Sequence, residues 1–228
     1  MKKNSLITVL GAVIALIVVA LVAVNFAPKS SQDNSPTAAG DLVEGTHYRL
    51  LKEPLSTGVN GVSVIEFFWY GCPHCRAFEP RIKEWLSKAP DDVDFKLVPV
   101  VWNDATRLHA AMFYTGLEAE RADELHASLF DLIIDNRQEK NLDRQIAIAG
   151  DLFQQHGVSA STLADSLTQS AIQTQVSQAQ KDMRTAEVSS TPSLVIGGKY
   201  LILNNEAVAE KGLFTVVDTL VDLVRQQS

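Results

Sequence analysis

Residues 61–75 read GVSVIEFFWYGCPHC, and this stretch decides the fold that we predict for the chain. The part from 61 to 70 is β-branched, aromatic and almost continuously hydrophobic, which is typical of a central strand buried on both faces. Within residues 72–88 the apolar side chains then recur at helical spacing, at Phe78, Ile82, Trp85 and Leu86. Residues 93–101 alternate like a second strand, so the three segments predict a strand–helix–strand unit with a right-handed connection.

The following residues first have a helical pattern and then return to strand patterns. Residues 104–187 predict a long helical block, with one apolar stripe at Leu125, Leu129, Leu132 and Ile133 and another at Ile172, Val176, Ala179, Met183 and Ala186. Two apolar runs, 193–196 and 199–203, flank Gly197-Gly198 and predict an antiparallel hairpin, and a last amphipathic helix follows. We therefore predict an α/β protein with a thioredoxin fold. Residues 42–103 and 188–228 would form its thioredoxin-like domain, and residues 104–187 an inserted all-helical domain.

The amino-terminal stretch predicts a membrane anchor. Residues 6–24 form a 19-residue run that only Thr8 and Gly11 relieve, and a helix needs roughly 20 apolar residues to cross a bilayer. Lys2 and Lys3 precede the run and favour a cytoplasmic amino terminus. We expect residues 1–27 to be a cytoplasmic stub with a single transmembrane helix. Residues 28–41, rich in Ser, Pro and Ala, would then be a flexible linker.

A cleaved signal peptide is the alternative interpretation of this stretch. Its apolar core usually runs for only about 7 to 15 residues. The best small-residue cleavage site ends at Ala27 and is followed by Pro28, which opposes cleavage. The uncleaved anchor is therefore the favoured interpretation, and either one places the folded part outside the inner membrane.

Composition excludes some classes of function. The formal net charge of -7, without a cluster of Lys or Arg beyond Lys2 and Lys3, argues against nucleic acid as a partner. The chain has only two cysteines, so a common four-ligand zinc site is not predicted. The other histidines show no ligand spacing and are expected to be ordinary surface or half-buried residues: His47, His109, His126 and His156. We expect neither a metal nor another cofactor beyond the two thiols themselves.

The two cysteines frame a short motif, Cys72-Pro73-His74-Cys75, at the start of the predicted helix. The first-turn N–H groups and the helix dipole favour a negative charge there, so the pKa of Cys72 is expected to be low. Pro73 suits the first helical turn, and His74 would add positive charge and donate to the thiolate. Cys75, one turn on, is expected to be more buried and to act as the resolving thiol.

An inert structural disulfide is the plain alternative for this motif, but a bridge that closes so short a loop gains little stability. A stabilised thiolate instead makes the Cys72–Cys75 disulfide a strong oxidant. A substrate thiolate would attack Cys72 to form a mixed disulfide, and the second thiol of the substrate would resolve it. The motif by itself is a moderate signal, which its position between a strand and a helix strengthens.

At these residues the chain resembles the DsbA family of bacterial disulfide oxidoreductases. The resemblance covers residues 42–228, including the helical insertion, and rests on residues 66–79, EFFWYGCPHCRAFE, and residues 191–200, TPSLVIGGKY. It implies that Pro192 is a cis-proline facing the dithiol and that Thr191 contacts substrate by strand addition. It also implies that Glu66 and Glu79 lie near the buried cysteine and tune its proton, with Lys96 as their basic partner.

The resemblance implies a function as well as a fold. We expect an enzyme that donates disulfides to unfolded or folding proteins that contain cysteine and is recharged by a DsbB-like, quinone-coupled membrane protein. The location would be the bacterial inner membrane with the catalytic domain in the periplasm, or the soluble periplasm after signal cleavage. Two alternatives stay open, because Thr191 before the proline is also typical of isomerase and reductase relatives: a disulfide isomerase or reductase, and a redox-inactive chaperone or assembly factor that binds peptides.

Overall fold

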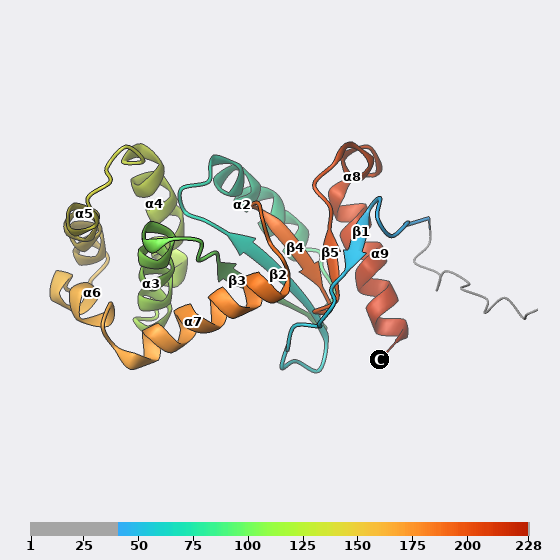
Figure 1. Ribbon diagram of the computed structural model, residues 1–228, viewed down its shortest axis with the longest axis horizontal. Helices are drawn as coiled ribbons and strands as arrows, with labels where there is room; N and C mark the ends of the chain where they lie inside the picture. The colour runs from blue at the N-terminus through green and yellow to red at the C-terminus, as the bar shows by residue number, and fades with distance from the viewer. Residues whose placement is uncertain (1–40, 228) are drawn as a thin grey trace, which may run out of the picture. The chain divides into compact units, whose positions relative to one another are not determined.

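The computed structural model describes residues 41–227, so the predicted anchor and nearly all of the predicted linker lie outside the described residues. Among the described residues, no helix is long and apolar enough to cross a membrane. Figure 1 shows a mixed sheet with helices around it. In chain order the elements are β1 (Tyr48–Leu50), β2 (Val62–Phe68), α2 (Pro73–Leu86), β3 (Val93–Pro99), α3 (Asp104–Glu118), α4 (Ala122–Asp135), α5 (Leu142–Gln155), α6 (Ala160–Ser166), α7 (Ser170–Thr185), β4 (Ser193–Ile196), β5 (Tyr200–Ile202), α8 (Glu206–Lys211) and α9 (Leu213–Gln226).

The five strands of the sheet lie in the order β1-β5-β4-β2-β3. β2 and β3 are parallel, whereas β4 pairs antiparallel with both β2 and β5. The predicted strand–helix–strand unit and the predicted antiparallel hairpin are therefore confirmed. The edge strand β1, which pairs antiparallel with β5, was not predicted, because three residues are too few to show an alternating pattern.

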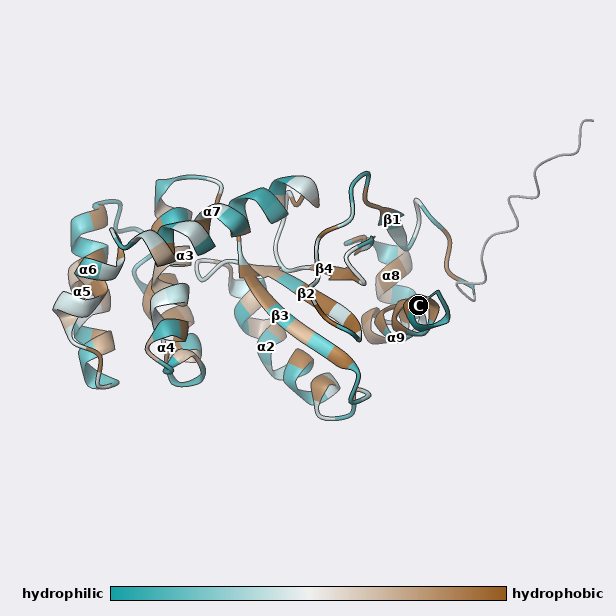
Figure 2. Ribbon diagram, turned by 90° about the horizontal axis from the view of Figure 1, so that it is seen from below, coloured by the Kyte–Doolittle hydropathy of each residue, from teal (hydrophilic) through white to brown (hydrophobic). Residues whose placement is uncertain are grey.

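The central strand β2 is buried along all seven of its residues, as its continuous hydrophobicity predicts. On one face Val62 and Val64 pack with apolar residues of α2 and α9. On the other face Ile65 and Phe67 pack with residues of β5 and of the end of α7. In Figure 2 the strand β4 and the helix α9 are drawn largely in the brown of hydrophobic residues, whereas α7 is mostly hydrophilic in this view. The sheet is thus held between two apolar layers, and the segment after β2 is rigidly placed.

The turn between β4 and β5 depends on its two glycines. Gly197 and Gly198 have φ angles of 58° and 66°, in the left-handed region that side chains disfavour. The N–H of Lys199 donates to the carbonyl of Ile196 at 3.0 Å and closes the turn. This is the hairpin geometry that two consecutive glycines predict.

Helices α3 to α6 enclose an apolar cluster that reaches into the thioredoxin-like part. Phe113, Leu129 and Phe153 belong to this cluster, and so do both cysteines, Phe68 at the end of β2 and Tyr70 just after it. The helical segment therefore packs directly on the start of α2. This contact places side chains of the insertion beside the two thiols.

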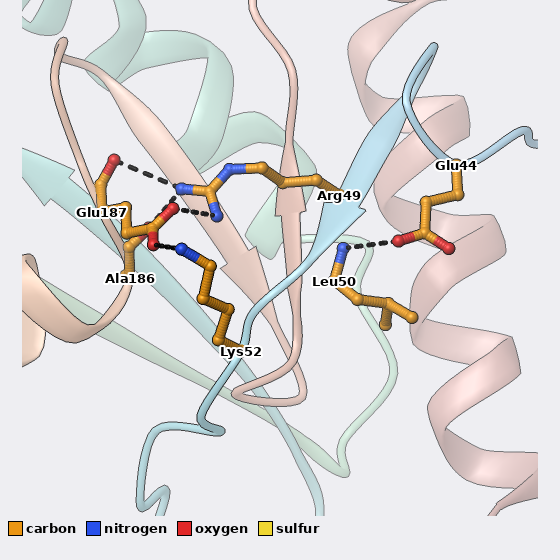
Figure 3. Close-up of polar contacts among 6 residues, drawn as sticks. All are labelled: Glu44, Arg49, Leu50, Lys52, Ala186 and Glu187. Carbon is orange, nitrogen blue, oxygen red and sulfur yellow. Dashed lines mark hydrogen bonds and ion pairs between the residues drawn. The ribbon is translucent and has the colours of Figure 1, made fainter.

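The end of α7 is fastened to the edge strand β1 by a charged contact (Figure 3). Glu187 follows the helix with a φ of 51°, and the N–H of Val188 donates to the carbonyl of Met183 at 3.0 Å, a common helix ending. The guanidinium of Arg49 donates to the carbonyls of Ala186 and Glu187 at 2.7 and 3.2 Å and pairs with the Glu187 carboxylate at 3.0 Å. Arg49 thereby satisfies carbonyls that the helix itself leaves without a partner.

We expect Arg49→Ala to lower the free energy of unfolding by about 1–3 kcal/mol, because it removes charge-assisted hydrogen bonds and leaves the end of α7 unsatisfied. Lys52→Ala is the matched control. Lys52 pairs with the same carboxylate at 2.7 Å, but its side chain is 83% exposed. A surface pair of this kind contributes about 0–1 kcal/mol. Urea unfolding of both variants measures the difference, and equal losses would contradict the assigned role of Arg49.

Candidate active site

The dithiol lies at the first turn of α2, where the sequence predicted it. Cys72 is the N-cap, with extended backbone angles, and its Sγ accepts a hydrogen bond from the N–H of Cys75 at 3.4 Å. Pro73 occupies the first turn of the helix. Both cysteines are free thiols, with 7% of Cys72 and 0% of Cys75 exposed to solvent. Only Cys72 therefore offers a partner any access to sulfur.

The two thiols differ sharply in acidity. A hydrogen bond from the Cys75 thiol lowers the pKa of Cys72 to about 5, against burial that raises it, and Thr191 and the N–H groups of Cys75 and His74 lower it further. The same bond between the thiols, followed by burial, raises the pKa of Cys75. His74 is exposed and contributes its backbone N–H to this pattern. The thiolate is thus concentrated on Cys72, as the helix start predicted.

A distant segment of the chain approaches the dithiol. The Thr191-Pro192 peptide bond is cis, as the resemblance implied. The carbonyl oxygen of Thr191 lies 3.4 Å from the Sγ of Cys72, although the two residues are 119 positions apart. Because β4 begins at the next residue, Ser193, the sheet itself places this segment against the start of α2.

Glu66 lies in the middle of β2 and is completely buried. Neither of its carboxyl oxygens has a hydrogen-bond partner among the described residues. Burial first, and then the negative charges of Glu79 and Cys72, raise the pKa of Glu66 well above its ordinary value. Its carboxyl group is therefore held toward the neutral form and is electrostatically coupled to the reacting thiol.

Glu79, one turn after Cys75 on α2, has the opposite character. Burial raises its pKa, but hydrogen bonds and charges from His126 and Lys83 outweigh burial and lower the pKa overall. Its Oε1 lies 3.1 Å from the Nε2 of His126, and its Oε2 lies 3.2 Å from the Nζ of Lys83. Glu66 and Glu79 are thus a coupled pair of carboxyl groups, in which Glu79 carries the charge.

Lys96 does not lie where the resemblance placed it. Its Nζ donates to the carbonyl of Thr57 at 2.7 Å and pairs with Asp94 at 3.2 Å. In the sheet Lys96 is the neighbour of Ile65, whereas the neighbour of Glu66 is Leu97. Because successive side chains of a strand point to opposite faces, Lys96 and Glu66 lie on different faces of the sheet. Lys83 and His126 instead contact Glu79 alone, and the carboxyl group of Glu66 has no basic partner among the described residues.

The sequence-based expectation for two histidines is wrong. His109 and His126 are 4% and 5% exposed, and both are hydrogen-bonded in the core, whereas His47 and His156 are half-buried, as expected. Their placement escaped prediction because a histidine on an amphipathic helix does not show which interior polar group it will meet. Among residues 41–227 no group of three or more potential ligands is arranged to hold a metal ion.

His126 of α4 joins the helical segment to the dithiol. Its Nδ1 lies 2.9 Å from the hydroxyl of Tyr70, two residues before Cys72. Because the Glu79 carboxylate must accept, Nε2 carries the proton and Nδ1 accepts from Tyr70 when the ring is neutral. The ring packs on Phe68 and Phe130, with centroids 5.2 and 5.0 Å away. Burial and Glu79 raise the pKa of Tyr70 well above its ordinary value, so the hydroxyl keeps its proton.

The fold and this site together define a class of protein, a thioredoxin-fold protein with a reactive dithiol at a helix start. A sequence model of the Thioredoxin family matches residues 60–218. The chain is 30% identical to the thiol:disulfide interchange protein DsbA of Pseudomonas syringae pv. tomato over 211 residues, 92% of this chain and 95% of that protein. It is 32% identical to the DsbA of Bordetella parapertussis over 178 residues, 76% of this chain and 82% of that protein.

A solved structure agrees with these relatives. The crystal structure of Pseudomonas aeruginosa DsbA superposes with a TM-score of 0.69 at 27% identity, and the match covers 82% of this chain and 96% of that one. The chain therefore belongs to the DsbA family of thiol:disulfide interchange proteins. It is a thiol-disulfide oxidoreductase with a thioredoxin fold and a helical insertion.

The acidity of Cys72 gives a direct prediction. Thiolate absorbance of the reduced protein should titrate with a midpoint near pH 5, the value that the hydrogen bonds to Cys72 produce. Cys75→Ala should raise this midpoint, because the Cys75 thiol is the largest of the stabilising donors. An unchanged midpoint in that variant would contradict the stabilising role of the Cys75 thiol.

The lowered pKa also predicts a pH dependence of stability. The Cys72 thiolate contributes its full stabilisation to the folded, reduced protein above the ordinary pKa of 9.0, and loses it as pH falls through about 5. Urea unfolding of the reduced and the oxidised protein measures the effect, because the oxidised protein has no thiolate. The free energy of unfolding of the reduced form, relative to that of the oxidised form, should fall as the pH is lowered from 9.0 to about 5. A difference that stays constant over this range would contradict the lowered pKa of Cys72.

The contact between Tyr70 and His126 predicts energetic coupling. We expect Tyr70→Phe and His126→Leu each to lower the free energy of unfolding by about 1–3 kcal/mol, since each leaves a buried polar group without its partner. The double variant should lose less than the sum of the two, by about 0.5–3 kcal/mol. His156→Leu is the control, because this half-buried ring has only a contact of 3.8 Å to Glu124. Strict additivity in urea unfolding would refute the proposed contact.

Proposed function

We propose that the protein donates disulfide bonds to cysteine-containing proteins outside the cytoplasm, through a mixed disulfide on Cys72. The observation that carries this proposal is the asymmetry of the dithiol. Cys72 is partly accessible and its pKa is lowered to about 5, whereas Cys75 is fully buried and its pKa is raised. Stabilisation of the reduced form by a thiolate makes the oxidised form a strong oxidant.

The proposed reaction begins with the Cys72–Cys75 disulfide. A thiolate of the client attacks the Sγ of Cys72, the bond between the two sulfur atoms breaks, and its electron pair passes to the Sγ of Cys75, which takes up a proton. The second thiolate of the client then attacks the client sulfur of the mixed disulfide and releases the Cys72 thiolate. The client is oxidised by two electrons, and the enzyme is left as the dithiol described above.

In this proposal, residues around the dithiol stabilise the thiolate and control proton uptake. Pro73 and the N–H groups of His74 and Cys75 hold the start of α2 as a site for the thiolate. The neutral carboxyl group of Glu66, coupled to Cys72, and the charged one of Glu79 tune proton uptake at the dithiol. The protein's own redox-active disulfide is the only redox group that the reaction needs.

The segment at Thr191-Pro192 is the proposed place for the client backbone. Its carbonyl at Thr191 lies beside the Cys72 Sγ, and an extended client segment that pairs with this backbone would bring its own cysteine to the same sulfur. Backbone pairing depends little on client sequence. This arrangement therefore suits an enzyme that oxidises many unfolded or folding proteins.

The remaining parts of the proposal concern place and partner. The apolar run of residues 6–24 supports a single-pass inner-membrane anchor within residues 1–27, followed by a linker over 28–41, with the catalytic part in the periplasm. Residues 42–103 and 188–228 would form the thioredoxin-like domain and residues 104–187 the insertion. A DsbB-like quinone-coupled membrane protein would reoxidise the dithiol. Signal cleavage, giving a soluble periplasmic enzyme, is the alternative.

Equilibration of the full chain with glutathione buffers tests the direction of the reaction. We expect a reduction potential nearer to about -120 mV, the known value of a DsbA, than to about -270 mV, that of thioredoxin. A potential near the thioredoxin value would favour the alternative of a reductase or isomerase. Cys72→Ser and Cys75→Ser should each abolish oxidation of a reduced client, because neither variant can form the Cys72–Cys75 disulfide, whereas Cys75→Ser should form a mixed disulfide on Cys72 with a client that already carries a disulfide. Retention of biological function by Cys72→Ser would favour the redox-inactive chaperone instead.

A further inference from the structure

The strand β3 forms one edge of the sheet, and within residues 41–227 it pairs with β2 alone. In Figure 2 no other strand lies on the far side of β3. A groove of ≈ 660 Å³ runs along this edge and is lined by four consecutive residues, 95–98. Because successive side chains point to opposite faces, a groove that touches all four follows the edge of the strand rather than one face. The backbone of this edge is therefore available to a second strand.

The side chains of β3 alternate strictly between apolar and charged residues. Val93, Phe95 and Leu97 pack on the apolar clusters that include residues of α2. Asp94 and Lys96 lie on the other face of the strand, where their charged groups are 3.2 Å apart and their side chains are 40% and 42% exposed. The opposite charges thus stand symmetrically about Phe95, with an apolar residue beyond each of them.

We propose that β3 pairs antiparallel with β3 of a second copy of this chain, about a two-fold axis at Phe95. In this register Asp94 of each copy lies directly opposite Lys96 of the other. On the opposite face Phe95 meets its own counterpart, and Val93 of each copy meets Leu97 of the other. Opposite charges and apolar side chains that face each other across two antiparallel strands stabilise the pair. Both faces of the strand are therefore self-complementary in one and the same register.

The charges also disfavour the neighbouring registers. An axis at Lys96 would place two lysines directly opposite each other, and an axis at Asp94 would do the same with two aspartates. An axis between two residues would set the apolar face of one copy against the charged face of the other. A lysine on an edge strand ordinarily opposes pairing with another chain. Here Asp94, two residues away, supplies the matching charge.

The proposed contact leaves both dithiols accessible. Phe95 lies beside Val64 in the first half of β2, whereas Cys72 follows the carboxyl end of that strand. Because the two copies of β3 would run in opposite directions, the two dithiols would lie toward opposite ends of the joined sheet. The inference concerns assembly and does not depend on the proposed function.

The mass of the full chain in detergent solution tests this inference. Light scattering measures the mass after the contribution of the detergent is subtracted. We expect twice the mass of one chain, because a two-fold contact uses the same surface on both copies and closes with two of them. The mass of a single chain, or of more than two, would overturn the inference.

Two charge reversals test whether β3 makes the contact. Lys96→Asp sets aspartates against aspartates across the proposed axis, and Asp94→Lys sets lysines against lysines, so each variant alone should be a monomer. Mixed in equal amounts, the two variants should form a heterodimer, because each lysine of one then faces an aspartate of the other. Dimers that persist in either variant alone, or a mixture that stays monomeric, would overturn the inference.

Two further variants control for folding and for net charge. The double variant Asp94→Lys with Lys96→Asp keeps the net charge and restores opposite charges across the axis, so it should be a dimer. Lys52→Asp reverses a charge just after β1, at the other edge of the sheet, where Lys52 is 83% exposed, and it should also remain a dimer. A monomeric Lys52→Asp would show that net charge, and not β3, governs association, and would overturn the inference.

Discussion

The negative charge on the Cys72 sulfur is the feature on which the rest of the site depends. It is stabilised by the thiol of Cys75 and by N–H groups in the first turn of α2, and also by Thr191 from a distant part of the chain. The helix supplies the N–H groups only because Cys72 is its N-cap, and the sheet supplies Thr191 only because β4 lies beside β2. Stabilisation of the thiolate therefore depends both on the start of α2 and on the pairing of β4 with β2.

Around this charge the protein keeps an unusual set of buried polar groups. Glu66 has no hydrogen-bond partner among the described residues and is pushed toward its neutral form, while Glu79 keeps its charge through His126 and Lys83. An unpaired buried carboxyl group costs stability, and such a cost is commonly found where a residue serves function. A carboxyl pair of this kind beside the dithiol supports the role in proton uptake that we propose for it.

The helical insertion contributes two histidine side chains that contact residues around the dithiol. Its His126 bonds to Tyr70 on one side of the dithiol and to Glu79 on the other, so the insertion braces both ends of the reacting turn. Its His109 holds the indole of Trp69 in place just before Cys72. The bonds to Tyr70 and Trp69 link the insertion to side chains within three residues of Cys72. A thioredoxin fold without this insertion would lack both braces.

By itself the sequence determined the strand before Cys72, the helix after it, the helical block and the glycine hairpin, because each has a local period or turn signal. It also determined the polarity of the dithiol, which follows from the position of Cys72 at a helix start. The tertiary structure alone decided the pairing of β1, the face on which Lys96 lies, and the burial of His109 and His126. These depend on contacts between residues far apart in the chain, and strand register and interior hydrogen bonds leave no local pattern from which they could be read.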